Sequence, residues 1–143
     1  MTQKIIINTD GGAIGNPGPA GIGVIIKDEG KEKKYSEKIG NATNNEAEYK
    51  ALIFSLKKTK LLFGKKNVKN IELDCYLDSE LLVKQLNGEY KIKEKDLQQL
   101  FIEVWNLKID FKNVKFIHVP REQNKEADAL VGQAIDKKQS KLI

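Results

Sequence analysis

The chain has 143 residues, of which 40% are hydrophobic and 31% charged, as expected of one ordinary globular domain. Basic residues exceed acidic ones by 25 to 20, a net charge of +5, which suits either plain solubility or a polyanionic partner. The single cysteine, Cys75, excludes an internal disulfide and a multi-cysteine zinc site. Apolar runs are shorter than the ~20 residues of a membrane span. The strand-like pattern that begins at Lys4 leaves no room for a signal peptide, so we expect a cytoplasmic protein.

Three neighbouring segments at the start of the chain predict an antiparallel meander. Lys4–Thr9 is a continuous apolar run, typical of a central strand buried on both faces. A turn-rich loop is expected from Gly11 to Pro19. The next two strands are predicted at Ala20–Ile26, where Gly21 and Gly23 indicate close packing of another element, and at Lys33–Ile39.

The rest of the chain alternates between helical and strand periodicity. Apolar residues from Tyr49 to Leu56 share one helical stripe, and either Thr43 or Asn44 is a suitable N-cap. The elements predicted after this helix are a strand at Ile71–Leu77, a short helix around Leu82–Leu86, a longer helix around Leu97–Leu107, a strand at Val114–Val119 and a last helix from Asn124 to about Lys138. This order predicts an α/β fold, with a five-stranded mixed β-sheet flanked by α-helices. We expect one domain over residues 1–143, with a flexible tail at its last few residues.

Four carboxylates fall at predicted element ends or helix starts: Asp10, Asp78, Glu48 and Asp128. Each has an ordinary interpretation as a turn residue, cap, helix-dipole partner or surface charge. Four converging acids would repel one another unless cations neutralised them, and all-carboxylate ligands select hard divalent ions such as Mg²⁺ or Mn²⁺. Small residues near two of the acids, Ala51 and Ser55 after Glu48 and Gly132 after Asp128, suggest how the helices approach neighbouring elements.

Four short motifs in the order and spacing of one family give this pattern a more specific interpretation. They are Thr9-Asp10-Gly11-Gly12 with Asn16-Pro17-Gly18, then Thr43-Asn44-Asn45-Glu46-Ala47-Glu48, then Leu77-Asp78-Ser79, and last Asn124-Lys125-Glu126-Ala127-Asp128. Together they resemble the motifs of type 1 ribonucleases H, over nearly the whole chain from Lys4 to about Gln133. The resemblance implies a ribonuclease H-like fold in a short, archaeal-like form. It also implies a metal-binding catalytic quartet of Asp10, Glu48, Asp78 and Asp128.

The same resemblance implies a substrate and a reaction. The family hydrolyses the RNA strand of an RNA–DNA hybrid endonucleolytically, with two Mg²⁺ ions for which Mn²⁺ can substitute, and leaves 5′-phosphate and 3′-hydroxyl ends. Positions that match the family's substrate contacts are Gly11, Gly12, Asn16, Thr43, Asn44 and Asn45. We therefore expect an RNA–DNA hybrid as partner, no membrane, no obligate protein partner and a monomer.

Two departures from the bacterial members of the family concern catalysis and affinity. Arg121 stands where those members carry a histidine in a loop before the last acid, and it is the only arginine of the chain. Arginine cannot titrate near neutrality, but its fork can hold a phosphate or stabilise developing charge. The lone histidine, His118, falls inside a predicted strand and is expected to be structural. The segment after Gly88 lacks the long basic insertion that many bacterial members use to grip substrate.

Three other interpretations compete with this one. A Holliday-junction resolvase or integrase core shares the superfamily, although the Asp-Gly-Gly and Thr-Asn-Asn strings argue against both. A non-catalytic hybrid- or RNA-binding module would be expected to lack at least one of the four acids, and none is missing. A detached domain of a reverse transcriptase is the third.

Overall fold

The computed structural model describes residues 2–140, with side chains through residue 135. Its strands are β1 (Gln3–Ala13), β2 (Gly18–Asp28), β3 (Lys31–Ala42), β4 (Ile71–Leu77) and β5 (Asn113–His118). Its helices are α1 (Asn44–Phe63), α2 (Glu80–Leu86), α3 (Lys95–Lys108) and α4 (Lys125–Ser140), and two 3₁₀ turns lie at Val68–Asn70 and Arg121–Asn124. The predicted order of strands and helices is confirmed. The expected flexible tail at the last few residues falls on 141–143, which lie outside the described residues.

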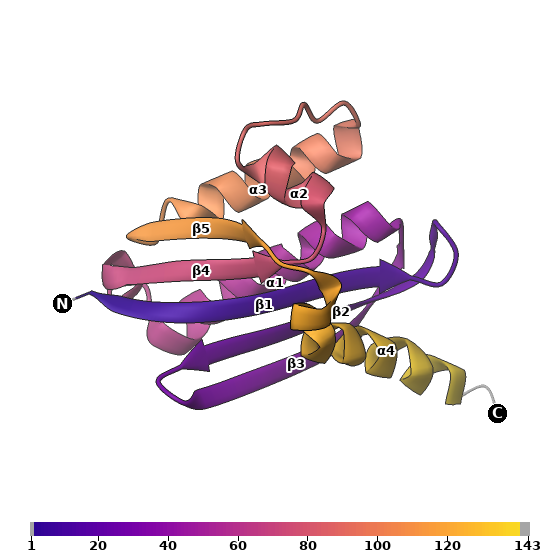
Figure 1. The fold of residues 1–143 in the computed structure, drawn as a ribbon, viewed down its shortest axis with the longest axis horizontal. Coiled ribbons are helices and arrows are strands. Elements are labelled where there is room, and N and C mark those ends of the chain that lie inside the picture. The colour runs from indigo at the N-terminus through magenta and orange to yellow at the C-terminus, as the bar shows by residue number, and fades with distance from the viewer. Residues whose placement is uncertain (1, 141–143) are drawn as a thin grey trace.

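The five strands form one mixed sheet in the order β3-β2-β1-β4-β5, visible in Figure 1. The first three strands pair antiparallel, so the predicted meander is confirmed. β4 and β5 then add in parallel to β1 and to each other. β1 therefore lies at the centre, as its continuous apolar run predicts, and its carboxyl half is directed the same way as that of β4.

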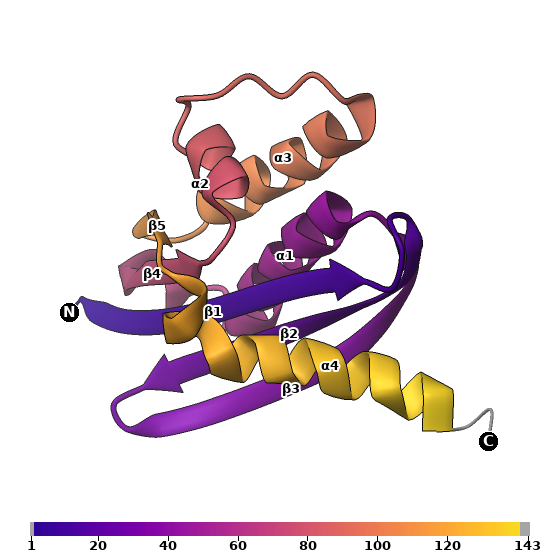
Figure 2. The same ribbon diagram turned by 45° about the vertical axis from the view of Figure 1, so that its right-hand side comes forward.

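Helices cover both faces of the sheet. Figures 1 and 2 show α1 behind the sheet and α4 in front of it, with α2 and α3 beside α1 at the end that carries β5. The main core lies between α1 and the sheet, where Tyr49, Leu52 and Leu56 are fully buried with Ile5 and Ile7. None of the helices within residues 2–140 is long and apolar enough to cross a membrane.

The first strand is longer than its sequence pattern predicts. Gly11 and Gly12 belong to β1 and pair with Ile22 and Gly21 of β2, so the expectation of a loop beginning at Gly11 is wrong. Consecutive glycines normally weaken a strand interior, but here pairing with β2 continues to Ala13 and holds them extended. Asp10 consequently lies within β1 and not at its end.

Glycines allow the helices to approach the sheet closely. A Cβ at Gly11 would lie 2.3 Å from the Ala47 carbonyl oxygen of α1, and one at Gly23 would lie 2.2 Å from that of Ala127 in α4. The predicted close packing at Gly21 and Gly23 is confirmed, since α4 occupies both places. A Cβ at Gly132 would meet nothing within 4 Å, so the close approach of α4 depends on strand glycines and Ala127, contrary to expectation.

Candidate active site

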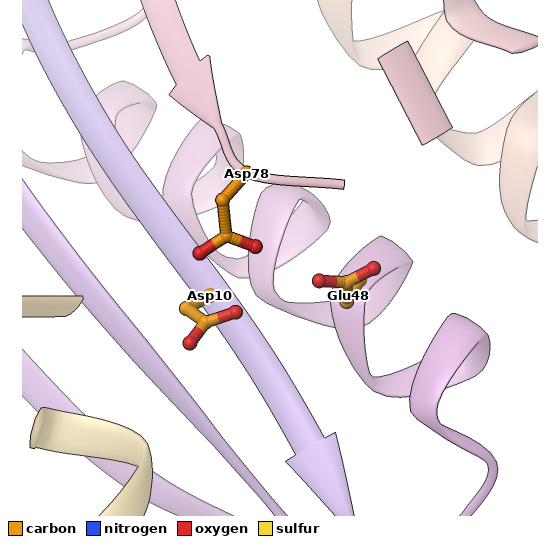
Figure 3. Close-up of side chains that lie close together, drawn as sticks. All are labelled: Asp10, Glu48 and Asp78. Carbon is orange, nitrogen blue, oxygen red and sulfur yellow. The ribbon is translucent and has the colours of Figure 1, made fainter. Parts of the chain in front are cut away.

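Three of the four predicted acids converge from three separate elements. Asp10 lies in β1, Asp78 directly follows the neighbouring parallel strand β4, and Glu48 lies in the second turn of α1. Figure 3 shows their carboxylates directed toward one another. One oxygen from each lies within 4.8 Å of the others. The contact of Gly11 with Ala47 holds α1 against β1 and so places Glu48 beside Asp10.

The fourth acid lies at the edge of this group. Asp128 is exposed in the first turns of α4 and is outside the tight cluster formed by the other three. It nevertheless acts on Asp10, because a hydrogen bond and the negative charge of Asp128 both raise the pKa of Asp10. All four acids also line one open cavity of about 540 Å³, whose wall includes Gly12, Asn44, Ser79, Arg121 and Val131.

Burial, together with the neighbouring negative charges, favours the protonated forms of Asp10 and Glu48 when no cation is present. Burial is the main cause that raises the pKa of Asp10 to about 8, followed by the charges of Asp78 and Glu48. Burial also raises the pKa of Glu48 to about 7, with the charge of Asp78 adding to it and a hydrogen bond from Ser79 and the charge of Arg121 opposing it. A divalent cation would relieve both the burial cost and the repulsion. The oxygen-only donor set therefore fits a hard divalent metal ion.

Comparison with known proteins assigns the chain that carries this acid cluster to a family. A family model described as reverse transcriptase-like matches residues 8–134. The crystal structure of LC11-RNase H1 in complex with an RNA/DNA hybrid superposes with a TM-score of 0.89 at 49% identity, over 94% of this chain and 99% of that one. The chain belongs to the type 1 ribonuclease H family. The match decides against the resolvase and integrase alternatives.

Two curated relatives of this chain are longer than it is. Ribonuclease HI of Halobacterium salinarum is 40% identical over 129 residues, which is 89% of this chain and 62% of that protein. The bifunctional protein Rv2228c of Mycobacterium tuberculosis is 37% identical over 137 residues, which is 94% of this chain and 36% of that protein. The chain thus spans between about a third and two thirds of the length of these curated relatives.

Three of the predicted substrate-binding residues of this ribonuclease H-like chain also build the start of α1. Thr43 is its N-cap: the Thr43 hydroxyl accepts from the Glu46 amide at 3.1 Å, and the Glu46 carboxylate accepts from the Thr43 amide at 2.8 Å. The Asn44 side-chain oxygen accepts from the Ala13 amide, and that of Asn16 accepts from the Asn44 amide, both at 2.9 Å. The side-chain NH₂ groups of Asn16 and Asn44 remain as donors.

The structure separates the two residues that compete for the place of the bacterial loop histidine. Arg121 begins the 3₁₀ turn before α4, is exposed and lines the acid cavity. His118 ends β5, opposite Leu77, with an exposed side chain and outside the lining of that cavity. The prediction that His118 lies in a strand is confirmed, but its exposure gives it no place in the core.

The sequence pattern did not reveal the contacts that Asn124 makes at the acid cluster. The sequence predicts that Asn124 begins the last helix, but the residue lies in the preceding 3₁₀ turn and is 2% exposed. Its side-chain Nδ2 donates to the Thr9 carbonyl at 2.9 Å and to Oδ2 of Asp78 at 3.2 Å. A polar residue before a helix resembles an ordinary cap. The place of Asn124 in the fourth motif is therefore the sequence signal that singles it out.

Proposed function

We propose that this protein hydrolyses the RNA strand of RNA–DNA hybrids, with divalent metal ions held by Asp10, Glu48, Asp78 and Asp128. The observation that carries the proposal is the convergence of three carboxylates within 4.8 Å, beside Asp128, at the wall of an open cavity. Support for the substrate comes from LC11-RNase H1, whose crystal structure is of a complex with an RNA/DNA hybrid.

Mg²⁺ is the ion we propose for this site, two per active site, with Mn²⁺ as a substitute. Both ions prefer oxygen ligands, and the four acids supply carboxylate oxygens as their metal ligands. Ions bound there would lower the pKa of the attacking water and stabilise the leaving oxygen of the phosphodiester, to give 5′-phosphate and 3′-hydroxyl ends. Asp10 is the most central acid, since the charges of the other three all act on it.

Recognition of the RNA strand is assigned to the residues around the start of α1. Asn16 and Asn44 use their side-chain oxygens within the protein, so each offers an NH₂ donor to a ribose 2′-hydroxyl acting as acceptor. Asn45 and the backbone groups of Gly11 and Gly12 complete the proposed contacts. The Thr43 hydroxyl accepts from the Glu46 amide and so keeps its own proton for a phosphate oxygen.

Arg121 is assigned to charge stabilisation. Its positively charged guanidinium lines the cavity beside the acids. Its positive charge already lowers the pKa of Glu48 against the effect of burial. A planar fork at this place suits a non-bridging phosphate oxygen pair, and it cannot serve as a general base.

We further propose that residues 1–143 form one ribonuclease H domain that acts as a monomer in the cytoplasm, without an obligate protein partner. The family match from residue 8 to 134 supports the single domain. The single, buried cysteine, Cys75, suits a reducing compartment such as the cytoplasm. Sedimentation at micromolar concentration tests the monomer, which requires a mass near 16.1 kDa.

The proposed activity is tested with end-labelled duplexes of one sequence: RNA–DNA hybrid, all-RNA and all-DNA, each with Mg²⁺ and with EDTA. We expect internal cleavage of the RNA strand of the hybrid, dependent on Mg²⁺. Hybrid binding without cleavage under every metal condition would instead support the non-catalytic binding module. Equal cleavage of the hybrid and the all-DNA duplex would contradict the proposed substrate.

A further inference from the structure

We propose that Asn124 is a positioning residue for the metal site, which fixes the carboxylate of Asp78 against β1 and is itself oriented by Asn8. This inference rests on the proposed function, because it assigns Asn124 a role toward the metal ions of that reaction. Asn124 touches none of the reacting atoms and acts through Asp78.

The contacts of Asn124 join three elements at the acid cluster. Its Nδ2 has two protons, and both are used, one on the Thr9 carbonyl of β1 and one on Oδ2 of Asp78 after β4. Asn124 itself belongs to the 3₁₀ turn that leads into α4, which carries Asp128. One buried amide therefore sets the positions of Asp78, β1 beside Asp10 and the start of α4 relative to one another.

The chemistry of an amide suits this place better than that of a cation. The chain leaves the sheet at Asp78. The next residue, Ser79, is already the N-cap of α2, where its hydroxyl oxygen accepts a hydrogen bond from the Leu82 amide at 3.2 Å. The Asp78 carboxylate is held near the charges of Asp10 and Glu48, so it needs a partner that fixes it. A lysine there would neutralise the site and compete with a metal ion. A neutral donor orients the carboxylate and leaves its charge available, as partners of metal-ligating carboxylates generally do.

The bond from Asn8 supports the orientation in which the Asn124 amide donates to Thr9 and Asp78. Nδ2 of Asn8 donates to Oδ1 of Asn124 at 3.1 Å, and this bond would be lost if the Asn124 amide turned over. A turned amide would direct an oxygen at the Asp78 carboxylate, which is repulsive. Asn8 is 8% exposed, lies two residues before Asp10 on the same face of β1, and has a side-chain oxygen without a partner among the described residues. Within that part of the chain, its side chain is therefore held by its bond to Asn124.

The test measures metal binding directly, in the absence of nucleic acid. Mn²⁺ is titrated calorimetrically into the parent protein, Asn124→Ala and the matched control Gln123→Ala, which changes the exposed neighbour in the same turn. We expect Asn124→Ala to weaken Mn²⁺ binding by about 10-fold or more, the usual effect of losing a ligand's partner. Hybrid binding in EDTA should stay within about twofold of the parent, and Gln123→Ala should match the parent in both measurements.

A purely structural role predicts a different result. If Asn124→Ala melts at a lower temperature but binds Mn²⁺ within about twofold of the parent, the proposal is overturned. Asn8→Ser provides a second variant should Asn124→Ala not fold. It keeps both donor bonds of Asn124 available but removes the bond that steadies its amide, so we expect a smaller loss of Mn²⁺ affinity, and an unchanged affinity contradicts the proposal. A parent that binds Mn²⁺ but cleaves no hybrid would overturn the proposed function alone.

Discussion

Arg121 is the only arginine among 25 basic residues, and among the described side chains it is the basic one that lines the acid cavity. We expect Arg121→Ala to lower the turnover of hybrid cleavage by about 10-fold or more, and to weaken hybrid binding much less, because its charge matters most when the phosphate gains charge. His118→Ala should leave turnover and melting temperature close to the parent, since that side chain is exposed and outside the cavity lining. Single-turnover rates and hybrid affinities of both variants check this. A loss of turnover confined to His118→Ala would reverse the two roles.

Asn45 provides a test of sugar recognition, because it lies in the first turn of α1 beside Asn44 and carries no charge. Its amide can meet a 2′-hydroxyl but adds little to salt-dependent affinity. We expect Asn45→Ala to weaken binding to the hybrid more than binding to a DNA duplex of the same sequence, with an almost unchanged salt slope. Fluorescence anisotropy over a salt series measures both, in an Asp10→Asn background. An equal loss on both duplexes would assign ribose recognition to other groups near Gly11 and Gly12.

At the scale of residues, the sequence predicted which charged side chains meet better than it predicted which hydrogen bonds form. Asp10, Glu48 and Asp78 meet as their motifs predict, whereas Asp128 stands outside the tight cluster. The hydrogen bonds of Asn124 could not be predicted, because its partners are 46 and 115 residues away and no local pattern indicates them. Local sequence patterns indicate caps and turns, but they do not identify a buried amide that joins segments distant in the sequence.

At the scale of elements, two close backbone contacts position the helices that carry Glu48 and Asp128. Gly11 lies against Ala47 of α1, and Gly23 lies against Ala127 of α4. The absence of a side chain at Gly23 lets α4 lie against β2 at Ala127. We expect Gly23→Ala to destabilise the protein by roughly 1–3 kcal/mol and to lower turnover, because a Cβ there meets backbone 2.2 Å away and displaces α4. Urea denaturation and cleavage rates measure the two effects.

Gly132→Ala is the matched control for that variant. It adds the same methyl group to α4 itself, where nothing lies within 4 Å, and it replaces a poor helix former. We expect this change to stabilise the protein by up to about 1 kcal/mol. Equal destabilisation by both changes would show that α4 does not depend on the close approach at Gly23.

The order of elements followed from the sequence, but the extent of β1 did not. Alternating or continuous apolar residues indicate strands and helical stripes well, and the parallel addition of β4 and β5 is consistent with the intervening helices. Gly11-Gly12 resembles a turn locally, and only pairing with Ile22 and Gly21 keeps it in the sheet. Tertiary pairing overrides local preference at such positions.

At the scale of the whole molecule, the acids make stability depend on pH when metal is absent. The pKa of Asp10 is raised to about 8 from an ordinary value of 3.8, and that of Glu48 to about 7 from 4.5, chiefly by burial in both cases. The folded protein therefore binds protons more tightly than the unfolded chain. Their contribution to stability is complete below about pH 4 and is lost as the pH rises through about 7 to 8.

We expect the free energy of unfolding in EDTA to fall by an amount on the order of a few kcal/mol between about pH 5 and pH 9. Mg²⁺ or Mn²⁺ should reduce this fall, because a bound cation replaces the protons. Asp10→Asn should flatten the curve in EDTA and raise the melting temperature at high pH. Chemical denaturation across this pH range provides the measurement, and a metal-free curve that stays level or rises would contradict the assigned electrostatics.

We propose that Asp10 and its neighbours act through bound divalent ions on an RNA–DNA hybrid. The most direct measurement is single-turnover cleavage of an end-labelled hybrid in Mg²⁺ by the parent and by Asp10→Asn, with hybrid binding and circular dichroism recorded for both. Because asparagine keeps the volume of the side chain and removes its charge, we expect a folded variant that still binds hybrid and cleaves none of it. Cleavage by Asp10→Asn within about threefold of the parent rate would contradict metal-dependent catalysis at these acids.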